Sequence, residues 1–226
     1  MTKAIIQMNQ LDYVAAFSRP ALSLWGDGAR ILQGLYDSFH GLHQGLNDIT
    51  VEGDPAHPAR QSVTVAIKPN AYYRFRFDRV EAQMVNFSDA HIATLPDILA
   101  RGDRWLREAI PSLAFQSHVL SYSSHSRLEG AKSSNVLASL TRTNFPMLGE
   151  SAGAGIIYRS ELPTRGWRTQ LTIDHSLVVP DGLFVYFEVL VNADQIDYGE
   201  ALTFARHLLD GAIDSIGVRF EGEDKS

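Results

Sequence analysis

The chain has 226 residues, of which 45% are hydrophobic and 20% charged, and its formal net charge at pH 7 is −6. These values are typical of a globular protein and exclude wholesale disorder and fibrous architectures. The chain contains no cysteine, which excludes disulfides, thiolate catalysis and cysteine-based metal sites. The acidic balance argues against a general nucleic-acid binder.

Two further absences in the sequence bear on location. There is no run of about 18 apolar residues, so no membrane span is expected. Residues 1–10 lack the charged region and apolar core of a secretion signal. We therefore expect a cytoplasmic protein, and no motif calls for a cofactor.

Residues 1–52 are expected to form an N-terminal helical segment packed on the main body. Apolar residues recur at helical spacing between residues 29 and 46. A loop follows at residues 53–58, where a glycine and two prolines lie close together. The main domain is expected over residues 60–226.

The middle of the chain mixes strand and helix patterns. Val63, Val65 and Ile67 alternate with polar or small residues and predict a strand. Residues 72–87 predict a second strand, with a bulge or bend near Asp78 that restores its alternation. The stretch 94–110 predicts a helix, 113–122 a strand and 133–143 a short helix.

The last third predicts three strands, at residues 155–160, 168–179 and 183–194, and a long helix from about residue 197 to residue 220. Short turns join neighbouring strands, which favours an antiparallel sheet. We therefore expect an α+β fold in which a largely antiparallel sheet of about six strands carries helices on one face, including a long C-terminal helix.

The segment from Val179 to Leu183 contains Pro-Asp-Gly, which predicts a three-residue hairpin loop closed by a left-handed Gly182. Pairing Val179 with Leu183 fixes the register of the two strands. It places Arg168 across from Asp194 and Asp174 across from Glu188. One face is then apolar except for His175, and the other is mixed polar and aromatic.

Directly opposed carboxylates are unfavourable in a sheet, so the Asp174–Glu188 pair needs compensation. Solvent on an exposed face or an arginine from a neighbouring strand, Arg159 or Arg127, would suffice. A bound cation, a shared proton for acid–base chemistry or a basic ligand would instead give the pair a function.

Gly149-Glu150-Ser151-Ala152-Gly153 matches G-x-S-x-G and resembles the nucleophile elbow of the carboxylesterases among the α/β-hydrolases. The resemblance implies Ser151 as nucleophile, with Asp174 or Asp197 and His207 as partners. The elbow requires a strand before the serine and a helix after it. Here a proline-containing segment precedes it and a predicted strand follows.

Histidines and arginines offer weaker candidates. His40 and His43 have a spacing that can hold a metal, but they lack a paired ligand motif, as do His118 and His125, so no metal site is expected. His175 is interpreted as a hydrogen-bonded core histidine.

Arginine outnumbers lysine sixteen to four, which is compatible with anion sites at Arg74 and Arg76 or along Arg101, Arg104 and Arg107. For the helical row, nearby carboxylates offer the alternative of mutual neutralisation.

The strand ending in Leu171-Thr172-Ile173-Asp174, the hairpin and the helix with His207 and Phe220 resemble a sporadically distributed bacterial family of unknown function. The resemblance covers about 60 residues and implies no activity.

Our leading interpretation is a non-enzymatic binding or assembly protein. It uses the polar–aromatic sheet face, with Asp174, Glu188, Tyr186 and Arg168 as ligand-binding candidates, to meet a protein partner or ligand. Self-association is expected, because edge strands need cover. The alternative is a hydrolase that uses Ser151, with His207, or the Asp174–Glu188 pair.

Overall fold

A computed structural model describes residues 1–42, 45–54, 57–67, 70–140, 155–162 and 165–221. The chain divides by its internal contacts into two compact units. Unit 1 comprises residues 1–10, 121–189 and 203–226, and unit 2 comprises residues 11–120 and 190–202. Each unit is described by itself below.

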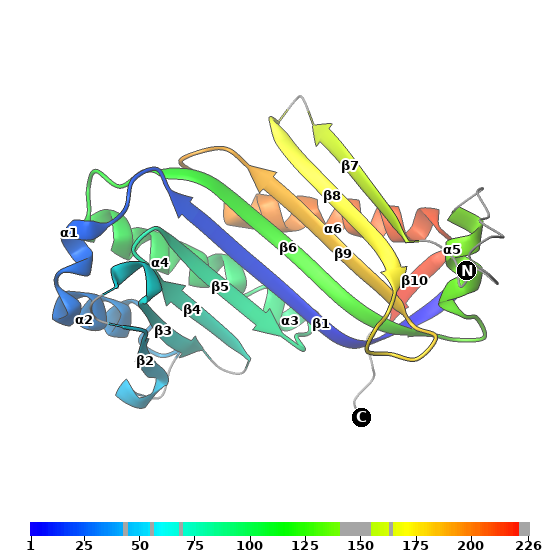
Figure 1. Cartoon of the computed structure of the whole chain (residues 1–226), viewed down its shortest axis with the longest axis horizontal. Helices are drawn as coiled ribbons and strands as arrows, with labels where there is room; N and C mark the ends of the chain where they lie inside the picture. The colour runs from blue at the N-terminus through cyan, green and yellow to red at the C-terminus, as the bar shows by residue number, and fades with distance from the viewer. Residues whose placement is uncertain (43–44, 55–56, 68–69, 141–154, 163–164, 222–226) are drawn as a thin grey trace. The chain divides into compact units, whose positions relative to one another are not determined.

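Strands dominate the described part of the chain (Figure 1). They are β1 (Thr2–Phe17), β2 (Ile49–Glu52), β3 (Ser62–Ile67), β4 (Ala71–Phe75), β5 (Arg79–Val85), β6 (Phe115–Leu128), β7 (Ile156–Leu162), β8 (Trp167–His175), β9 (Leu183–Val191) and β10 (Val218–Glu221). They pair in the order β2-β3-β4-β5-β1-β6-β9-β8-β7, and β10 pairs with β1 in parallel. The α+β class with a large antiparallel sheet is confirmed, but the expected number of about six strands is wrong, since the described residues form ten.

Helices account for fewer of the described residues than strands do. They are α1 (Leu22–Trp25), α2 (Gly28–Ser38), α3 (Asp89–Ile92), α4 (Leu95–Ala109), α5 (Ser133–Leu140) and α6 (Tyr198–Ser215), with 3-10 turns η1 (Leu46–Asp48) and η2 (Pro58–Arg60). The predicted C-terminal helix is therefore one helix among several. It ends at Ser215, and Phe220 lies in β10 instead, across from Ala4 of β1.

The N-terminal segment corrects the expectation of a helical region at residues 1–52. Residues 2–17 form β1, and α1 and α2 are the only α-helices among the described residues of that region. Leu11, Tyr13, Ala15 and Phe17 are all buried and alternate with less buried residues. This period of two is the signature of a strand with one buried face, and it overrides the helical interpretation.

In unit 2, the stretch predicted as one bent strand is the β4–β5 hairpin. Tyr73 and Phe75 face Ala82 and Val80 across the hairpin, and all four are buried. The expected bend near Asp78 is the turn between the two strands. The turn restores the alternation, so the arginines of these strands lie on the sheet face opposite the buried rings.

Two glycines let the helices of unit 2 approach closely. A Cβ at Gly34 of α2 would lie 1.9 Å from Nε1 of Trp105 in α4, and a Cβ at Gly102 of α4 would lie 2.4 Å from Cζ of Tyr73. Only glycine leaves room for these contacts. The helices α2 and α4 thereby pack tightly over the buried face of β4.

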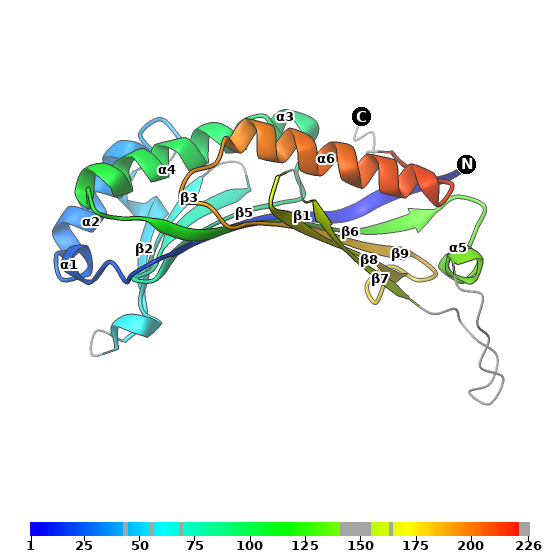
Figure 2. The same cartoon turned by 90° about the horizontal axis from the view of Figure 1, so that it is seen from above.

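In unit 1, α6 covers one face of the strands, here called the inner face (Figure 2). The odd-numbered residues of β9 from Leu183 to Val189 are buried. Trp167 of β8 meets Phe204 of α6 edge-on, with ring centroids 5.1 Å apart. The even-numbered residues of β8 and β9 therefore lie on the other face, which we call the outer face of unit 1.

The predicted hairpin register is wrong. The Ser176 amide donates to the Gly182 carbonyl at 2.9 Å, so β8 ends at His175 and a loop spans residues 176–182. Ser176 Oγ accepts from the amides of Val178 and Val179 at 3.2 and 2.8 Å. Because these two amides donate to Ser176, they are not available for hydrogen bonds to β9, and β8 ends four residues before the predicted end at residue 179.

The turn itself also differs in detail. The Gly182 amide donates to the Val179 carbonyl at 2.9 Å, and the left-handed residue is Asp181, with φ 52°, rather than Gly182. Glycine is required at 182 because a Cβ there would lie 2.7 Å from the Ser126 carbonyl oxygen. The position of the turn was predictable, but the length of its loop was not.

Candidate functional site

The structure places all four expected ligand-binding residues on the outer face of unit 1: the exposed Arg168 and three further candidates, Asp174, Tyr186 and Glu188. Ile173 and Val185, their inner-face neighbours, are fully buried, and strand alternation turns the even-numbered side chains the other way. All three candidates are half-buried, so solvent reaches each of them. The face that was predicted from the sequence is retained.

Asp174 and Glu188 do not oppose each other, because the register has shifted. Antiparallel pairing continued from the Ser176–Gly182 hydrogen bond puts Phe184 across from Asp174 and Gln170 across from Glu188. A displacement of four residues along a strand corresponds to about 13 Å. The predicted repulsion between the two carboxylates, and the shared proton that it could support, therefore have no structural basis.

Each carboxylate instead has one local hydrogen bond. The His175 amide donates to Oδ1 of Asp174 at 2.7 Å, and the Tyr186 hydroxyl donates to Oε2 of Glu188 at 2.5 Å. Among the described residues neither carboxylate makes an ion pair. We call Asp174, Phe184, Tyr186 and Glu188 the acid–aromatic strip, since two carboxylates flank two aromatic rings.

A histidine borders this strip on β6. The His125 ring lies 4.9 Å from the Phe184 ring, centroid to centroid, and its Nδ1 lies 2.8 Å from Ser176 Oγ. Partial burial lowers the pKa of His125 from its usual value of 6.5. The imidazole is therefore less readily protonated than a free histidine, which limits the positive charge beside Asp174.

Two arginines of this face, Arg159 and Arg168, have partners other than the strip. Arg159 of β7 donates to Gln170 at 2.9 Å, and Nε of Arg168 lies 3.3 Å from a Glu161 oxygen. The predicted Arg168–Asp194 pair is therefore wrong. Asp194, in unit 2, accepts from the Phe115 amide at 2.7 Å and pairs with Arg107.

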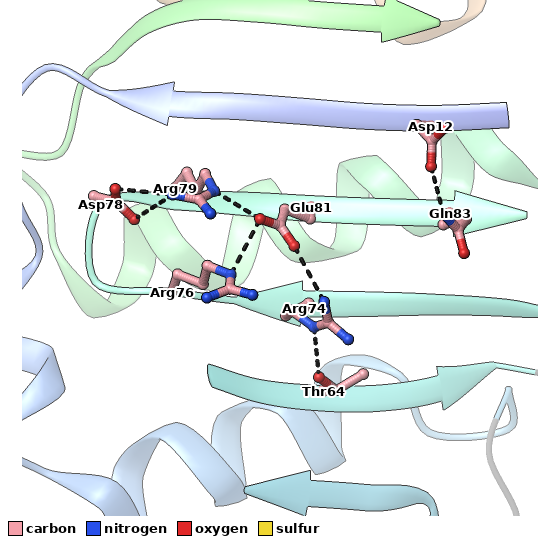
Figure 3. A network of polar contacts seen from close by, with 8 residues as sticks. All are labelled: Asp12, Thr64, Arg74, Arg76, Asp78, Arg79, Glu81 and Gln83. Carbon is pink, nitrogen blue, oxygen red and sulfur yellow. Dashed lines mark hydrogen bonds and ion pairs between the residues drawn. The ribbon is translucent and has the colours of Figure 1, made fainter. Parts of the chain in front are cut away.

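The outer face of the sheet in unit 2 carries a different kind of polar cluster (Figure 3). Arg74 and Arg76 flank Glu81 at 3.4 and 3.1 Å, and Arg79 approaches it at 2.6 Å. Arg79 also pairs with Asp78 at 3.0 Å. We call Arg74, Arg76, Asp78, Arg79 and Glu81 the arginine network.

Burial raises the pKa of Glu81, but the Arg79 hydrogen bond and the charges of Arg76, Arg79 and Arg74 outweigh it, so the pKa is lowered overall. Arg74 is also held by Thr64 at 2.9 Å and lies over the Tyr72 ring. The three arginines thus have partners inside the protein. The sequence suggested an anion site at Arg74 and Arg76, whereas the structure gives them an internal anion.

The hydrolase candidates are not assembled by the described residues. Ser151 and the rest of its G-x-S-x-G motif lie outside the described residues, which resume at Gly155. His207 is an exposed residue of α6, on the inner side of the sheet, whereas Asp174 and Glu188 lie on the outer face. Asp197, in unit 2, accepts from the Glu200 amide at 2.8 Å and begins α6.

The remaining histidines have structural partners or lie apart. His175 Nδ1 lies 2.7 Å from Ser133 Oγ, which confirms a hydrogen-bonded ring and ties α5 to β8. His40 is exposed, and His43 lies outside the described residues. The described residues contain no group of three or more His, Asp or Glu side chains that could hold a metal ion.

A buried cluster in unit 2 was missed from the sequence. Tyr13 OH lies 2.7 Å from His118 Nδ1 and 3.5 Å from Tyr198 OH. Burial raises the pKa of Tyr198 to about 12 and lowers the pKa of His118 from 6.5. The alternation of β1 was the signal that could have placed Tyr13 in the core. The three rings, from β1, β6 and the first turn of α6, act as polar packing.

Two of the three arginines in the row of α4 follow the neutralised alternative. Arg101 pairs with Asp97 at 2.8 Å and Arg107 with Asp103 at 2.9 Å, each one helical turn apart.

None of the described helices combines the length and the apolar character that a membrane span requires.

Comparison with known proteins gives no match, either to a protein-family model or to a curated protein. The resemblance of the last third to a bacterial family of unknown function stays a prediction. We therefore infer function from the geometry of the two outer faces.

Proposed function

We propose that this chain is a binding or assembly protein, and that the outer face of unit 1 meets a basic segment of a protein partner. One observation carries the proposal. Asp174 and Glu188 are half-buried carboxylates with no ion pair among the described residues, whereas the carboxylate on the outer face of unit 2 is contacted by three arginines. Unit 1 thus offers negative charge that nothing described neutralises.

The chemistry of the acid–aromatic strip suits arginine or lysine side chains. A carboxylate pairs with the cationic head group, and an aromatic ring accepts the stem or the cation on its face. Asp174 and Glu188 are offset along the strand direction by four residues, about 13 Å, which matches the spacing of side chains four residues apart in an extended peptide. The net charge of −6 adds a general attraction for a basic partner.

The hydrolase alternative lacks comparable support. A nucleophile and its base must lie within hydrogen-bond reach. The described residues bring His207 together with neither Asp174 nor Glu188, and the shifted register removes the carboxylate dyad. The proposal therefore assigns these carboxylates to recognition rather than to acid–base chemistry.

The test uses a labelled nine-residue peptide of Ser, Thr and Gly with two arginines four residues apart. Fluorescence anisotropy at low ionic strength is expected to show binding to the wild type. Asp174→Asn combined with Glu188→Gln is expected to weaken binding by about tenfold or more, since each lost charged contact contributes about 1 kcal/mol or more.

A matched control removes two carboxylates from the other side of the sheet. Asp210→Asn with Asp214→Asn changes two exposed residues of α6 and the net charge by the same amount. Binding by this control is expected to stay close to wild type. Equal weakening of peptide binding in both double variants would show that net charge alone causes the effect, which would contradict a specific site. Absence of binding to the wild type would also overturn the proposal.

A further inference from the structure

The strand β7 ends the sheet, and this edge carries the further inference. β7 pairs with β8 on one side, and among the described residues no strand pairs with its other side. Ile157 and Tyr158 are 59% and 67% exposed. An open edge with exposed apolar side chains is a template for pairing with another strand.

We propose that β7 pairs antiparallel with β7 of a second copy of this chain, about a two-fold axis at Ser160. In this register Arg159 faces Glu161 of the second copy, and Tyr158 faces its Leu162. A two-fold axis generates each of these pairs twice, because the same patch is used on both copies. The inference is independent of the partner proposed for the outer face.

The pairing with β8 extends the argument across four strands. Within one copy, Arg159 lies across from Gln170 and Glu161 across from Arg168, with contacts of 2.9 and 3.3 Å. The proposed register joins these into a row that reads Gln170, Arg159, then Glu161 and Arg168 of the second copy. Opposite charges meet directly across the new strand pair, which is the favourable arrangement.

The other face of β7 gives rows that agree with this register. Leu162 lies across from Trp167 and Tyr158 across from Leu171. The new pairing would therefore produce the row Trp167, Leu162, then Tyr158 and Leu171 of the second copy, which is aromatic or aliphatic throughout. The central row consists of Ser160 and Thr169 from each copy, and all four side chains carry a hydroxyl.

Neighbouring registers lack this agreement. A two-fold axis perpendicular to the sheet must pass through a residue position, so the alternatives centre on Arg159 or on Glu161. The first sets two arginines directly against each other, and the second sets two glutamates. Like charges directly opposite are destabilising, so the charge pattern of β7 favours the axis at Ser160 over these two neighbouring registers.

The absence of cysteine from the chain makes a cysteine scan direct. Ser160→Cys is expected to form a disulfide-linked dimer under mild oxidation, because side chains directly opposite lie close enough to be bridged. Arg159→Cys and Glu161→Cys are each expected to stay uncrosslinked alone and to crosslink when mixed. Crosslinking of Arg159→Cys or Glu161→Cys alone, without Ser160→Cys, would overturn the register.

Sedimentation of the unmodified chain provides the second readout. A dimer at micromolar concentration is expected, and Arg159→Glu is expected to raise its dissociation constant about tenfold or more, since it makes two Glu–Glu confrontations. Mixing Arg159→Glu with a Glu161→Arg, Arg168→Gln variant is expected to restore a dimer, because every facing pair is again of opposite charge. A strict monomer, or open-ended polymers in place of a dimer, would contradict the proposal.

Discussion

The outer sheet faces of the two units use their charges in opposite ways. In unit 2, Glu81 is 16% exposed and serves three arginines at once. In unit 1, Asp174 accepts one hydrogen bond from the His175 amide and Glu188 accepts one from the Tyr186 hydroxyl, and no described arginine reaches either carboxylate. The first face is satisfied internally, and the second leaves negative charge for a partner.

This difference teaches that an arginine-rich or acidic surface does not by itself indicate a site. The arginine network consists of residues that would suggest an anion site in sequence, and it stabilises the fold instead. The acid–aromatic strip has fewer charges, but these charges lack counterions within the described residues.

The largest effect is expected from neutralising the carboxylate of the arginine network. Glu81→Gln should lower the free energy of unfolding by about 1–3 kcal/mol, because the partly buried arginines lose their common partner. Glu188→Gln, the matched change in unit 1, should alter it by less than about 0.5 kcal/mol. Urea denaturation measures the free energy of unfolding of both variants. An equal decrease in the two would contradict the proposed difference between the faces.

The same network predicts a pH dependence. The folded pKa of Glu81 lies below its usual value of 4.5, so the unfolded chain takes up the proton first as the pH falls. The stabilisation by Glu81 is therefore complete above about pH 4.5 and is lost as the pH falls through the folded pKa. The stability difference between wild type and Glu81→Gln should shrink over this range, and a constant difference would contradict the assignment.

Much of the fold could be predicted from local patterns. The alternation at Val63–Ile67 and the apolar period at 95–109 gave β3 and α4. The strand β1 was missed because its alternation begins only at Leu11, and its first ten residues are mixed in polarity. Its central place in the sheet depends on pairing with β5 and β6, which are distant in sequence and leave no local signal.

The candidate site could be predicted only in part, for a related reason. The face that Asp174, Tyr186 and Glu188 share follows from strand parity, which survives a shift of four residues. The register does not follow from the Pro-Asp-Gly turn, because the competing hydrogen bonds of Ser176 decide where β8 ends. The neutralisation of the arginines by Glu81 became visible only when the β4–β5 register placed Arg74 across from Glu81.

A smaller effect is expected from crowding Asp174 without changing its charge. A Cβ at Gly155 would lie 2.4 Å from Cγ of Asp174, so Gly155→Ala should turn the carboxylate away. Stability should fall by less than about 1 kcal/mol because the displaced atoms end a side chain, while binding of the arginine peptide should weaken. Gly211→Ala is the control, because nothing lies within 4 Å of a Cβ at that position. Unchanged peptide binding in Gly155→Ala would show that Asp174 does not contribute to the binding site.

A still smaller effect concerns His125. Partial burial lowers its folded pKa below 6.5, so its stabilising contribution is complete above about pH 6.5 and declines as the pH falls through the folded value. Its protonation would also place a cation beside Phe184 and reduce affinity for the arginine peptide. Imidazole resonances followed by NMR should titrate below pH 6.5. In His125→Gln, the corresponding part of the pH dependence of binding should disappear.

The smallest expected effect is the most decisive for the geometry of the outer face. Leu177 is 98% exposed in the loop after β8, so Leu177→Ser should change the free energy of unfolding by less than about 0.5 kcal/mol. In the three-residue hairpin register, Leu177 would lie on the apolar inner face beside Val185, and the same substitution would cost about 2 kcal/mol or more. Val185→Ala, at a fully buried position, is the control. It measures, in the same denaturation assay, how far a substitution on the inner face lowers the free energy of unfolding. A large loss in Leu177→Ser would return Asp174 to a position across from Glu188, and the two carboxylates would again form a repelling pair instead of the two ends of the acid–aromatic strip.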